Sequence, residues 1–491
     1  MDNDSSARGL QRGVLGAADS VVMAVAGSAP AYSLTATTVS LFAAVGLAGP
    51  GALLWCGIPM LGIAFAFSYL GKADVNAGAA YSWVRKAMHP SLGFIAGWAL
   101  VVSATLFMVA ACLPAGAATL SLIDPNRNWT TAETTGVGAV WFLAMVALVV
   151  AGVKVTAKAQ WVMSSVEIAI LLVVAVMALV HTSNRHGTPF SWSWFSPTQF
   201  HSVAGFAGGA LVAAFYYWGW DVTANLNEES KKSKLTAMGG IIGVVIVFLL
   251  FEIFTIATNI TLPAATVGNI NDTTILTDLA TAVGGGAMGK IMIVAVILYT
   301  IATLETTLIQ VSRSLFAMGR DQTLPKVFGR IHPTRRTPAI ATLIVAGVSL
   351  ALFFGANFIG SVGTIMNDAI LAIGVQIAVY YSLAALAVVV AYRRDIFASV
   401  RNMIFIGLLP LIGAAFMLFT LEQNVFGSGL SGETKSIALG ALALGLIPLA
   451  VYWAKRVPYY TRGAQLASET ELLDGEIPAQ ATTSAEPAAA S

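Results

Sequence analysis

Long apolar runs, separated by short polar segments, set the pattern of the chain. A helix that crosses a bilayer needs roughly 20 mostly apolar residues. Twelve runs are long enough: 15–46, 49–71, 93–121, 134–152, 159–181, 203–226, 236–261, 287–313, 338–356, 361–391, 402–421 and 434–454. The pattern therefore predicts an all-α integral membrane protein with twelve transmembrane helices.

Lysine and arginine residues are distributed unequally between the two sides of these predicted helices. With twelve helices both termini share one side, and that side holds all but four of the 26 lysines and arginines. The exceptions are Arg127, Arg185, Lys290 and Lys435. Cytoplasmic loops carry such an excess of positive charge. We therefore expect a multi-pass protein of the cell membrane (inner or plasma membrane) with both termini in the cytoplasm.

The composition excludes most other classes of protein. Of the 491 residues, 57% are hydrophobic and only 10% are charged, whereas soluble domains carry about 25% charged residues. A soluble enzyme, a secreted disulfide scaffold, a disordered protein and a nucleic-acid binder are excluded on that basis. The two cysteines, Cys56 and Cys112, lie in apolar runs, and the histidines show no metal-ligand spacing. We expect no metal site, no cofactor and no nucleic-acid partner.

The runs and the polar ends divide the chain into four parts. We expect a cytoplasmic N-terminal tail at 1–14, a core of ten helices at 15–400 and two further helices at 401–456. Residues 465–491 are rich in Ala, Glu, Thr, Ser and Pro, and we expect residues 457–491 to form a disordered cytoplasmic C-terminal tail.

Two of the predicted helices contain sequences that interrupt a helix. The overlong first run holds Ala26-Gly27-Ser28-Ala29-Pro30, and the sixth holds a stretch of five aromatic residues around a glycine at 215–221, ending in an acid. Proline and glycine both disfavour a helix interior. Broken helices 1 and 6 would place free N–H and C=O groups at mid-membrane, where they can bind a small zwitterion. Matching breaks also indicate two five-helix halves, 1–5 and 6–10.

Several stretches resemble the amino acid–polyamine–organocation family of permeases. Gly27-Ser28-Ala29 is similar to the family's break in helix one, and 215–221 with 227–231 to the break and exit of helix six. The stretch 312–321, followed by Thr337-Pro338, is similar to the loop after helix eight. The resemblance implies the LeuT-like fold, a five-plus-five inverted repeat, here followed by two C-terminal helices. Family members import or exchange amino acids, polyamines and related amines.

The resemblance also implies a substrate site at the two breaks. The backbone from Val25 to Ala29 would meet the substrate's amino and carboxyl groups, and aromatic side chains would line the pocket for its side chain. Asp221 matches an acid that some relatives use for pH response or amine recognition. The expected substrate-binding residues are Val25, Ala26, Gly27, Ser28, Ala29, Phe215, Tyr216, Trp218 and Asp221. Ala29-Pro30 departs from the family pattern, because proline removes one N–H donor for a carboxylate.

Ionisable residues at membrane depth are candidates for function. The acids at that depth are Glu167, Asp221, Glu252, Glu305 and Asp368. Glu167 stands where proton-coupled relatives often carry a lysine in helix five. Glu167 and Glu305 both lie eight residues, about 12 Å, from the cytoplasmic end of their runs. Two close carboxylates cannot both ionise cheaply, so we expect a proton-coupling pair at Glu167 and Glu305.

The remaining acids are expected to have structural roles, and sodium is an alternative to the proton as coupling ion. Glu252 and Asp368 are expected to be structural, and the polar pair Glu228 and Glu229 to be solvated or paired with the lysines that follow. Sodium is the alternative coupling ion, because two carboxylates with nearby hydroxyl groups suit a hard cation. The nearby hydroxyl groups belong to Ser164, Thr303 and Thr306.

These observations indicate a secondary active transporter, a permease that moves an amino acid across the cytoplasmic membrane by proton symport with alternating access. An importer or exchanger of polyamines or other organic amines is the alternative, as is sodium coupling. A channel and a membrane enzyme are more distant alternatives. A channel would be expected to carry a repeated filter motif, and an enzyme a clustered nucleophile and base or a metal set. The sequence carries none of these, so we expect no enzymatic activity.

Overall fold

The chain is helical throughout the part that the structure describes. The computed structural model describes residues 9–180, 186–200, 202–263, 274–356, 358, 362–427, 430–463 and 466. Within these ranges the β-type pairing is limited to an isolated parallel bridge between Leu15 and Ser230. The predicted all-helical architecture is therefore confirmed for the described residues.

The first half of the chain forms helices that follow the predicted apolar runs. In chain order they are α1 (Ala17–Ser28), α2 (Pro30–Val45), α3 (Gly49–Ala73), α4 (Ala80–Ala87), α5 (Pro90–Ile123), α6 (Thr131–Ala151) and α7 (Val153–Val180). Short 3₁₀ turns connect the elements of the whole chain at Gly46–Ala48, Trp192–Phe195, Pro197–Gln199, Asn227–Glu229, Lys326–Gly329 and Ile396–Ala398.

The second half contains the longest helix of the described chain. In chain order the helices are α8 (Val203–Tyr216), α9 (Val222–Asn225), α10 (Ser233–Thr261), α12 (Ile275–Arg320), α13 (Ala339–Ala356), α14 (Val362–Ala391), α15 (Val400–Asn402), a π-helical segment (Met403–Leu408), α16 (Leu409–Val425), α17 (Gly432–Leu444), α18 (Leu446–Ala454) and α19 (Pro458–Thr461). Helix α12 changes direction at Gly285, where φ is +71°.

Ten helices of the described chain are long and apolar enough to cross a membrane. The two runs expected at 15–46 and 49–71 form one continuous candidate, Ala17–Ala73. The run at 203–226 contains the shorter apolar helix Val203–Tyr216, because the chain leaves the helix at its break. The chain is thus a multi-pass membrane protein, and the finer count of twelve helices is not confirmed.

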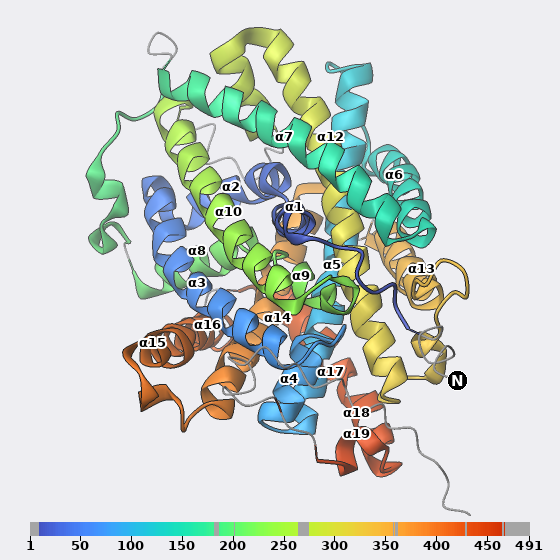
Figure 1. The fold of residues 1–491 in the computed structure, drawn as a ribbon. Coiled ribbons are helices and arrows are strands. Elements are labelled where there is room, and N and C mark those ends of the chain that lie inside the picture. The colour runs from blue at the N-terminus through green and yellow to red at the C-terminus, as the bar shows by residue number, and fades with distance from the viewer. Residues whose placement is uncertain are drawn as a thin grey trace, which may run out of the picture.

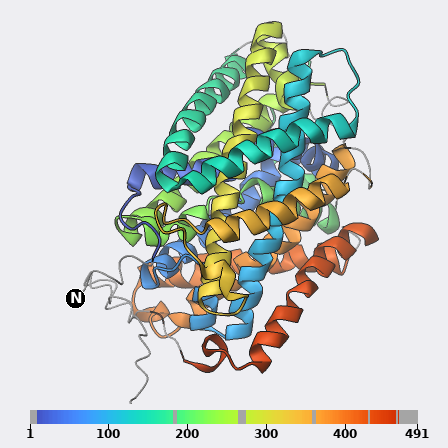
Figure 2. The same ribbon diagram turned by 90° about the vertical axis from the view of Figure 1, so that its right-hand side faces the viewer.

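The interrupted helices lie inside the bundle. Helix α1 packs against α10, α12 and α7, and α2 packs against α8 and α12. Figure 1 shows α1 near the centre of the molecule with α10 and α12 on either side. Helices α5 and α12 pack together and run the height of the bundle in Figure 2. The breaks are therefore enclosed by protein on all sides.

Part of the segment expected to be disordered is folded. Most of the range 457–491, and residues 1–8 of the N-terminal tail, lie outside the described residues. The first residues of the range 457–491, however, form α19, and Tyr459 is 2% exposed. The Tyr459 ring stacks on Tyr81 with 4.7 Å between centroids. Arg85 also lies over this ring. Burial of an aromatic side chain therefore orders the first residues of the segment that was expected to be disordered.

Candidate functional site

The first helix is interrupted at Ala29. Helix α1 ends at Ser28, Ala29 adopts the left-handed conformation with φ 46° and ψ 63°, and α2 begins at Pro30. A left-handed conformation is uncommon for a residue with a Cβ. Proline at the first position of α2 removes the N–H that would continue the α1 ladder. Local sequence and backbone strain together therefore end one helix and start the next at this point.

The second break lies between α8 and α9. Helix α8 ends at Tyr216, and α9 starts again at Val222. Gly219 lies between them with φ +101°, a conformation that glycine adopts without the steric penalty of a side chain. Residues 217–221 therefore form turns, not a helix, in this part of the bundle.

The two breaks contact each other through their backbones. A Cβ placed on Gly27 would lie 2.2 Å from Gly219 O, and one placed on Gly219 would lie 2.2 Å from Gly27 O. Such distances leave no room for a side chain at either position. Thr303 of α12 adds a hydrogen bond from its hydroxyl to Gly27 O at 3.3 Å. The sequences that predicted two separate breaks therefore meet at one buried place.

Asp221 is the charged residue at this meeting point. It is 1% exposed. Gln310 Nε2 and Tyr380 OH each donate to Asp221 Oδ2 at 2.9 Å, and Tyr381 OH donates to Oδ1 at 3.1 Å. Trp218 Nε1 donates to Tyr380 OH at 2.6 Å. The sequence pointed to Asp221 and Trp218, but it gave no signal for the three donors on α12 and α14.

Aromatic rings form a cluster beside the breaks. Tyr32, Phe107, Phe215 and Trp218 lie with ring centroids 5.2 to 6.4 Å apart. We call these four residues the aromatic cluster. Tyr32 and Phe107 were not expected from the sequence, because they lie on α2 and α5 in ordinary apolar runs.

The other expected residues take separate places. Tyr216 OH shares a 2.6 Å hydrogen bond with Thr38 Oγ1, and its ring packs on Phe251 rather than on the aromatic cluster. Val25 and Ala26 are buried in the last turn of α1. The Ser28 hydroxyl donates to Ala24 O at 3.2 Å.

Glu167 and Glu305 are both buried but do not form a contacting pair. Glu305 Oε2 accepts a hydrogen bond from Gln160 Nε2 at 2.7 Å. Gln160 precedes Glu167 by seven residues on α7, which is about 10 Å along the helix. Neither oxygen of Glu167 has a hydrogen-bond partner. The residue of α7 that contacts Glu305 is therefore Gln160, and no hydrogen bond joins Glu167 to Glu305.

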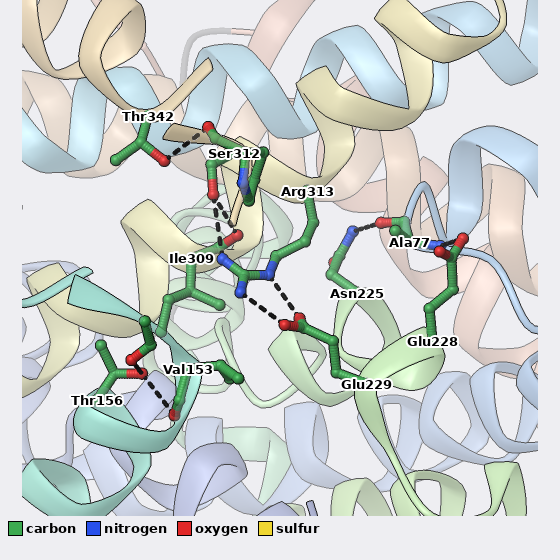
Figure 3. A network of polar contacts seen from close by, with 12 residues as sticks. Ala77, Val153, Thr156, Asn225, Glu228, Glu229, Ile309, Ser312, Arg313 and Thr342 are labelled. Carbon is green, nitrogen blue, oxygen red and sulfur yellow. Dashed lines mark hydrogen bonds and ion pairs between the residues drawn. The ribbon is translucent and has the colours of Figure 1, made fainter. Parts of the chain in front are cut away.

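The acids after the second break are paired more deeply than expected. Arg313 Nε and Nη2 donate to the Glu229 carboxylate at 2.8 and 3.1 Å, and both side chains are at most 1% exposed. Figure 3 shows the Arg313 guanidinium directed at Glu229, with Glu228 turned toward Ala77. Glu228 also pairs with Arg320. The expectation that these glutamates are solvated or paired with the following lysines is therefore wrong for both.

Of the other polar candidates, some have ordinary hydrogen-bond partners and some have none. Thr434 Oγ1 donates to Asp368 Oδ1 at 3.1 Å. Thr306 donates to the α12 backbone. Neither Glu252 oxygen nor the Ser164 hydroxyl has a hydrogen-bond partner. Among the described residues, no group of three or more His, Cys, Asp or Glu side chains could hold a metal ion.

Long apolar helices, two of them interrupted where they meet, define a multi-pass membrane protein of the transporter class. Residues 19–446 match the family described as Amino acid permease. The chain belongs to this amino acid permease family. It is a membrane transporter, and not an enzyme.

Individual relatives transport different solutes. The Methylthioribose transporter of Bacillus subtilis is 24% identical over 390 residues, which cover 76% of this chain and 80% of that protein. The Low-affinity putrescine importer PlaP of Escherichia coli is 25% identical over 61% of this chain and 66% of its own length. The Branched-chain amino acid permease BcaP of Bacillus subtilis is 25% identical over 62% and 67%, respectively.

Proposed function

We propose that this chain is a secondary active transporter that imports a small amino acid or organic amine by proton symport with alternating access. The observation that carries the proposal is the contact between the two buried breaks at Gly27 and Gly219. Discontinuous helices expose peptide groups that bind the charged ends of small solutes. Asp221 and the aromatic cluster lie beside this contact and supply charge and apolar surface.

The proposed topology has twelve helices in the cell membrane, with both termini in the cytoplasm. The continuous segment Ala17–Ala73 would comprise the first two helices, and α8 with α9 would form the sixth. Residues 15–400 would contain the two five-helix repeats, and 401–456 the two further helices. The excess of lysine and arginine on one side of this arrangement supports the orientation.

The proposed substrate site consists of the expected residues at the two breaks. Peptide groups from Val25 to Ala29 would bind the polar end of the solute. Phe215 and Trp218 would contact its apolar part, and Tyr216 would support the break from its other side. An ammonium group would contact Asp221 and the faces of the aromatic rings.

Glu167 and Glu305 are the proposed proton-coupling residues. Both are fully buried. Both Glu167 oxygens and Glu305 Oε1 have no hydrogen-bond partner. An uncompensated carboxylate in a bilayer is costly unless it binds a proton or a cation. Sodium remains the rival ion for the same groups.

An organic amine is the second candidate substrate class, and one observation favours it. Asp221 is buried, and its hydrogen-bond donors, Gln310, Tyr380 and Tyr381, are all neutral. A cationic solute would neutralise this carboxylate. The similarity to a putrescine importer supports the same class.

Uptake by purified protein in liposomes tests the proposal. We expect saturable uptake of a labelled amino acid or amine, and accumulation above the external concentration when an inward proton gradient is imposed without sodium. Accumulation that follows a sodium gradient, and is indifferent to protons, would replace the proton by sodium. Flux that does not saturate and only equilibrates the solute would identify a channel instead.

A further inference from the structure

An apolar groove lies between α5, α13 and α17. Helices α13 and α17 both pack on α5, and in Figure 2 the light-orange α13 and the red α17 lie against the light-blue α5. The groove has a volume of about 370 Å³, which is within the range of pockets that hold a small ligand. Val348 on α13 and Leu444 on α17 line it and are 50% and 59% exposed. The groove is therefore open at the surface of the bundle, and none of the expected substrate-binding residues lines it.

The lining of the groove suits a hydrocarbon chain and not a water-soluble solute. Of the lining residues, only Trp98 and Thr105 carry a polar side-chain atom. The Trp98 indole N–H donates to Ala441 O at 3.0 Å, and the Thr105 hydroxyl donates to Val101 O at 2.7 Å. Neither side-chain donor of the lining is therefore left for a polar ligand.

A positively charged turn borders the groove. The 3₁₀ turn Lys326–Gly329 contributes Phe328 to the lining. Lys326 and Arg330 are exposed, and neither forms an ion pair with any residue that the structure describes. Residues 322–337 contain two further arginines and no acid. This segment connects α12 and α13, two of the candidate membrane-crossing helices, so its charges lie where lipid headgroups lie.

We propose that the groove binds one acyl chain of an anionic phospholipid, whose headgroup phosphate is held by Lys326 and Arg330. Burial of methylene groups against apolar side chains favours the acyl chain in the groove. Basic residues at a membrane surface attract anionic headgroups. A phospholipid without net charge offers the same chains but does not complement the two cations. The lipid is distinct from the transported solute, so the inference is independent of the proposed function.

Native mass spectrometry of the full purified chain in a neutral detergent tests the inference. The probes are dioleoyl phosphatidylglycerol and dioleoyl phosphatidylcholine, which share their chains and differ in net charge. We expect one phosphatidylglycerol to bind at least about tenfold more tightly than phosphatidylcholine, since each basic residue near a membrane surface adds roughly fivefold. In the double variant Lys326→Ala/Arg330→Ala the two lipids should bind within about threefold of each other. Glycerol phosphate, which has no chains, should not displace phosphatidylglycerol at equal concentration.

Matched variants on α7 separate this site from the rest of the surface. Lys154→Ala/Lys158→Ala also removes two exposed charges four positions apart, and should keep the lipid preference. Val348→Trp fills the groove from a half-exposed position and should weaken phosphatidylglycerol binding about tenfold. Val176→Trp, at a position that is 57% exposed and outside the lining, should leave it within about threefold.

Four results would overturn the inference. The first is equal binding of the two lipids by the unmodified chain, and the second is a preference that survives in Lys326→Ala/Arg330→Ala. Unchanged phosphatidylglycerol affinity in Val348→Trp would show that the chain lies outside the groove. Loss of the preference in Lys154→Ala/Lys158→Ala would show a response to overall charge and not to these two cations.

Discussion

Asp221 shows what a single residue can decide at this site. Its carboxylate accepts hydrogen bonds from Gln310, Tyr380 and Tyr381. Asp221→Asn removes the charge and turns an amide N–H₂ toward groups that donate. We expect the affinity for a cationic amine to fall about tenfold or more, because hydrogen bonds to charged groups are worth about 1.5–3 kcal/mol. Calorimetric titration with the amine and with a neutral amino acid measures the difference.

Tyr381→Phe is the matched control for this prediction. It removes one donor and keeps the Asp221 charge, so the amine should retain most of its affinity. Equal losses for amine and neutral amino acid in Asp221→Asn would show that the residue supports the helix break and does not recognise charge.

At the residue scale the sequence indicated the acids but not their partners. Asp221 is conspicuous because it follows an aromatic stretch and a glycine inside an apolar run. Gln310 and Tyr380 lie 89 and 159 residues away in the sequence. A polar residue in a helix gives no local signal of which neighbour it will face. The pairing of Arg313 with Glu229 was missed for the same reason, since only the folded bundle brings them together.

The contact between the broken helices leads to a prediction at the scale of elements. Gly219→Ala should force the breaks apart, because its Cβ would lie 2.2 Å from Gly27 O. Overpacking of this kind costs about 1–3 kcal/mol, and the positive φ of Gly219 adds strain. We expect a lower thermal midpoint and loss of uptake. Gly208→Ala, on the preceding helix α8, is the control, since nothing lies within 4 Å of a Cβ there. Equal uptake by both variants would contradict a tight contact.

Helices and helix breaks could be predicted from the sequence where a single physical cause determines them. Apolar runs predicted the helices, because a bilayer requires uninterrupted apolar length. Proline and glycine predicted interruptions within 26–30 and 215–221, where α1 ends at Ser28 and α8 ends at Tyr216. The contact of Gln160 on α7 with Glu305 on α12 was not predictable from residue counts, because side-chain packing sets how one helix lies along another.

The proposed alternating access would involve the whole molecule, and a variant of Glu167 would separate substrate binding from proton coupling. Glu167→Gln mimics a permanently protonated side chain. We expect it to exchange labelled for unlabelled solute across liposomes, yet to lose accumulation driven by a proton gradient. Counterflow and gradient-driven uptake are measured on the same preparation. Full gradient-driven accumulation by this variant would remove Glu167 from the coupling mechanism.

For the molecule as a whole, the number of membrane-crossing helices predicted from the sequence differs from the number of candidate helices in the structure. Apolar length indicated twelve helices, whereas ten helices of the described chain meet the requirements of length and hydropathy. The difference arises at Ala17–Ala73, which counts as one candidate although it is interrupted at Ala29, and at the short helix Val203–Tyr216. A broken helix can cross the membrane along its overall path although neither of its parts is long enough to cross alone. The number of membrane crossings therefore follows neither from the apolar runs alone nor from the helix lengths alone.

The isolated pairing of Leu15 with Ser230 allows motion of the segment before α1 to be followed by hydrogen–deuterium exchange. The Val14 and Leu15 amides donate to Glu229 O, and the Lys231 amide donates to Leu15 O. Such amides exchange with deuterium only when their hydrogen bonds open. Any departure of α1 from this connection must break all three bonds together. A common exchange rate of these three amides would therefore report how often α1 separates from this connection, even when no solute is present.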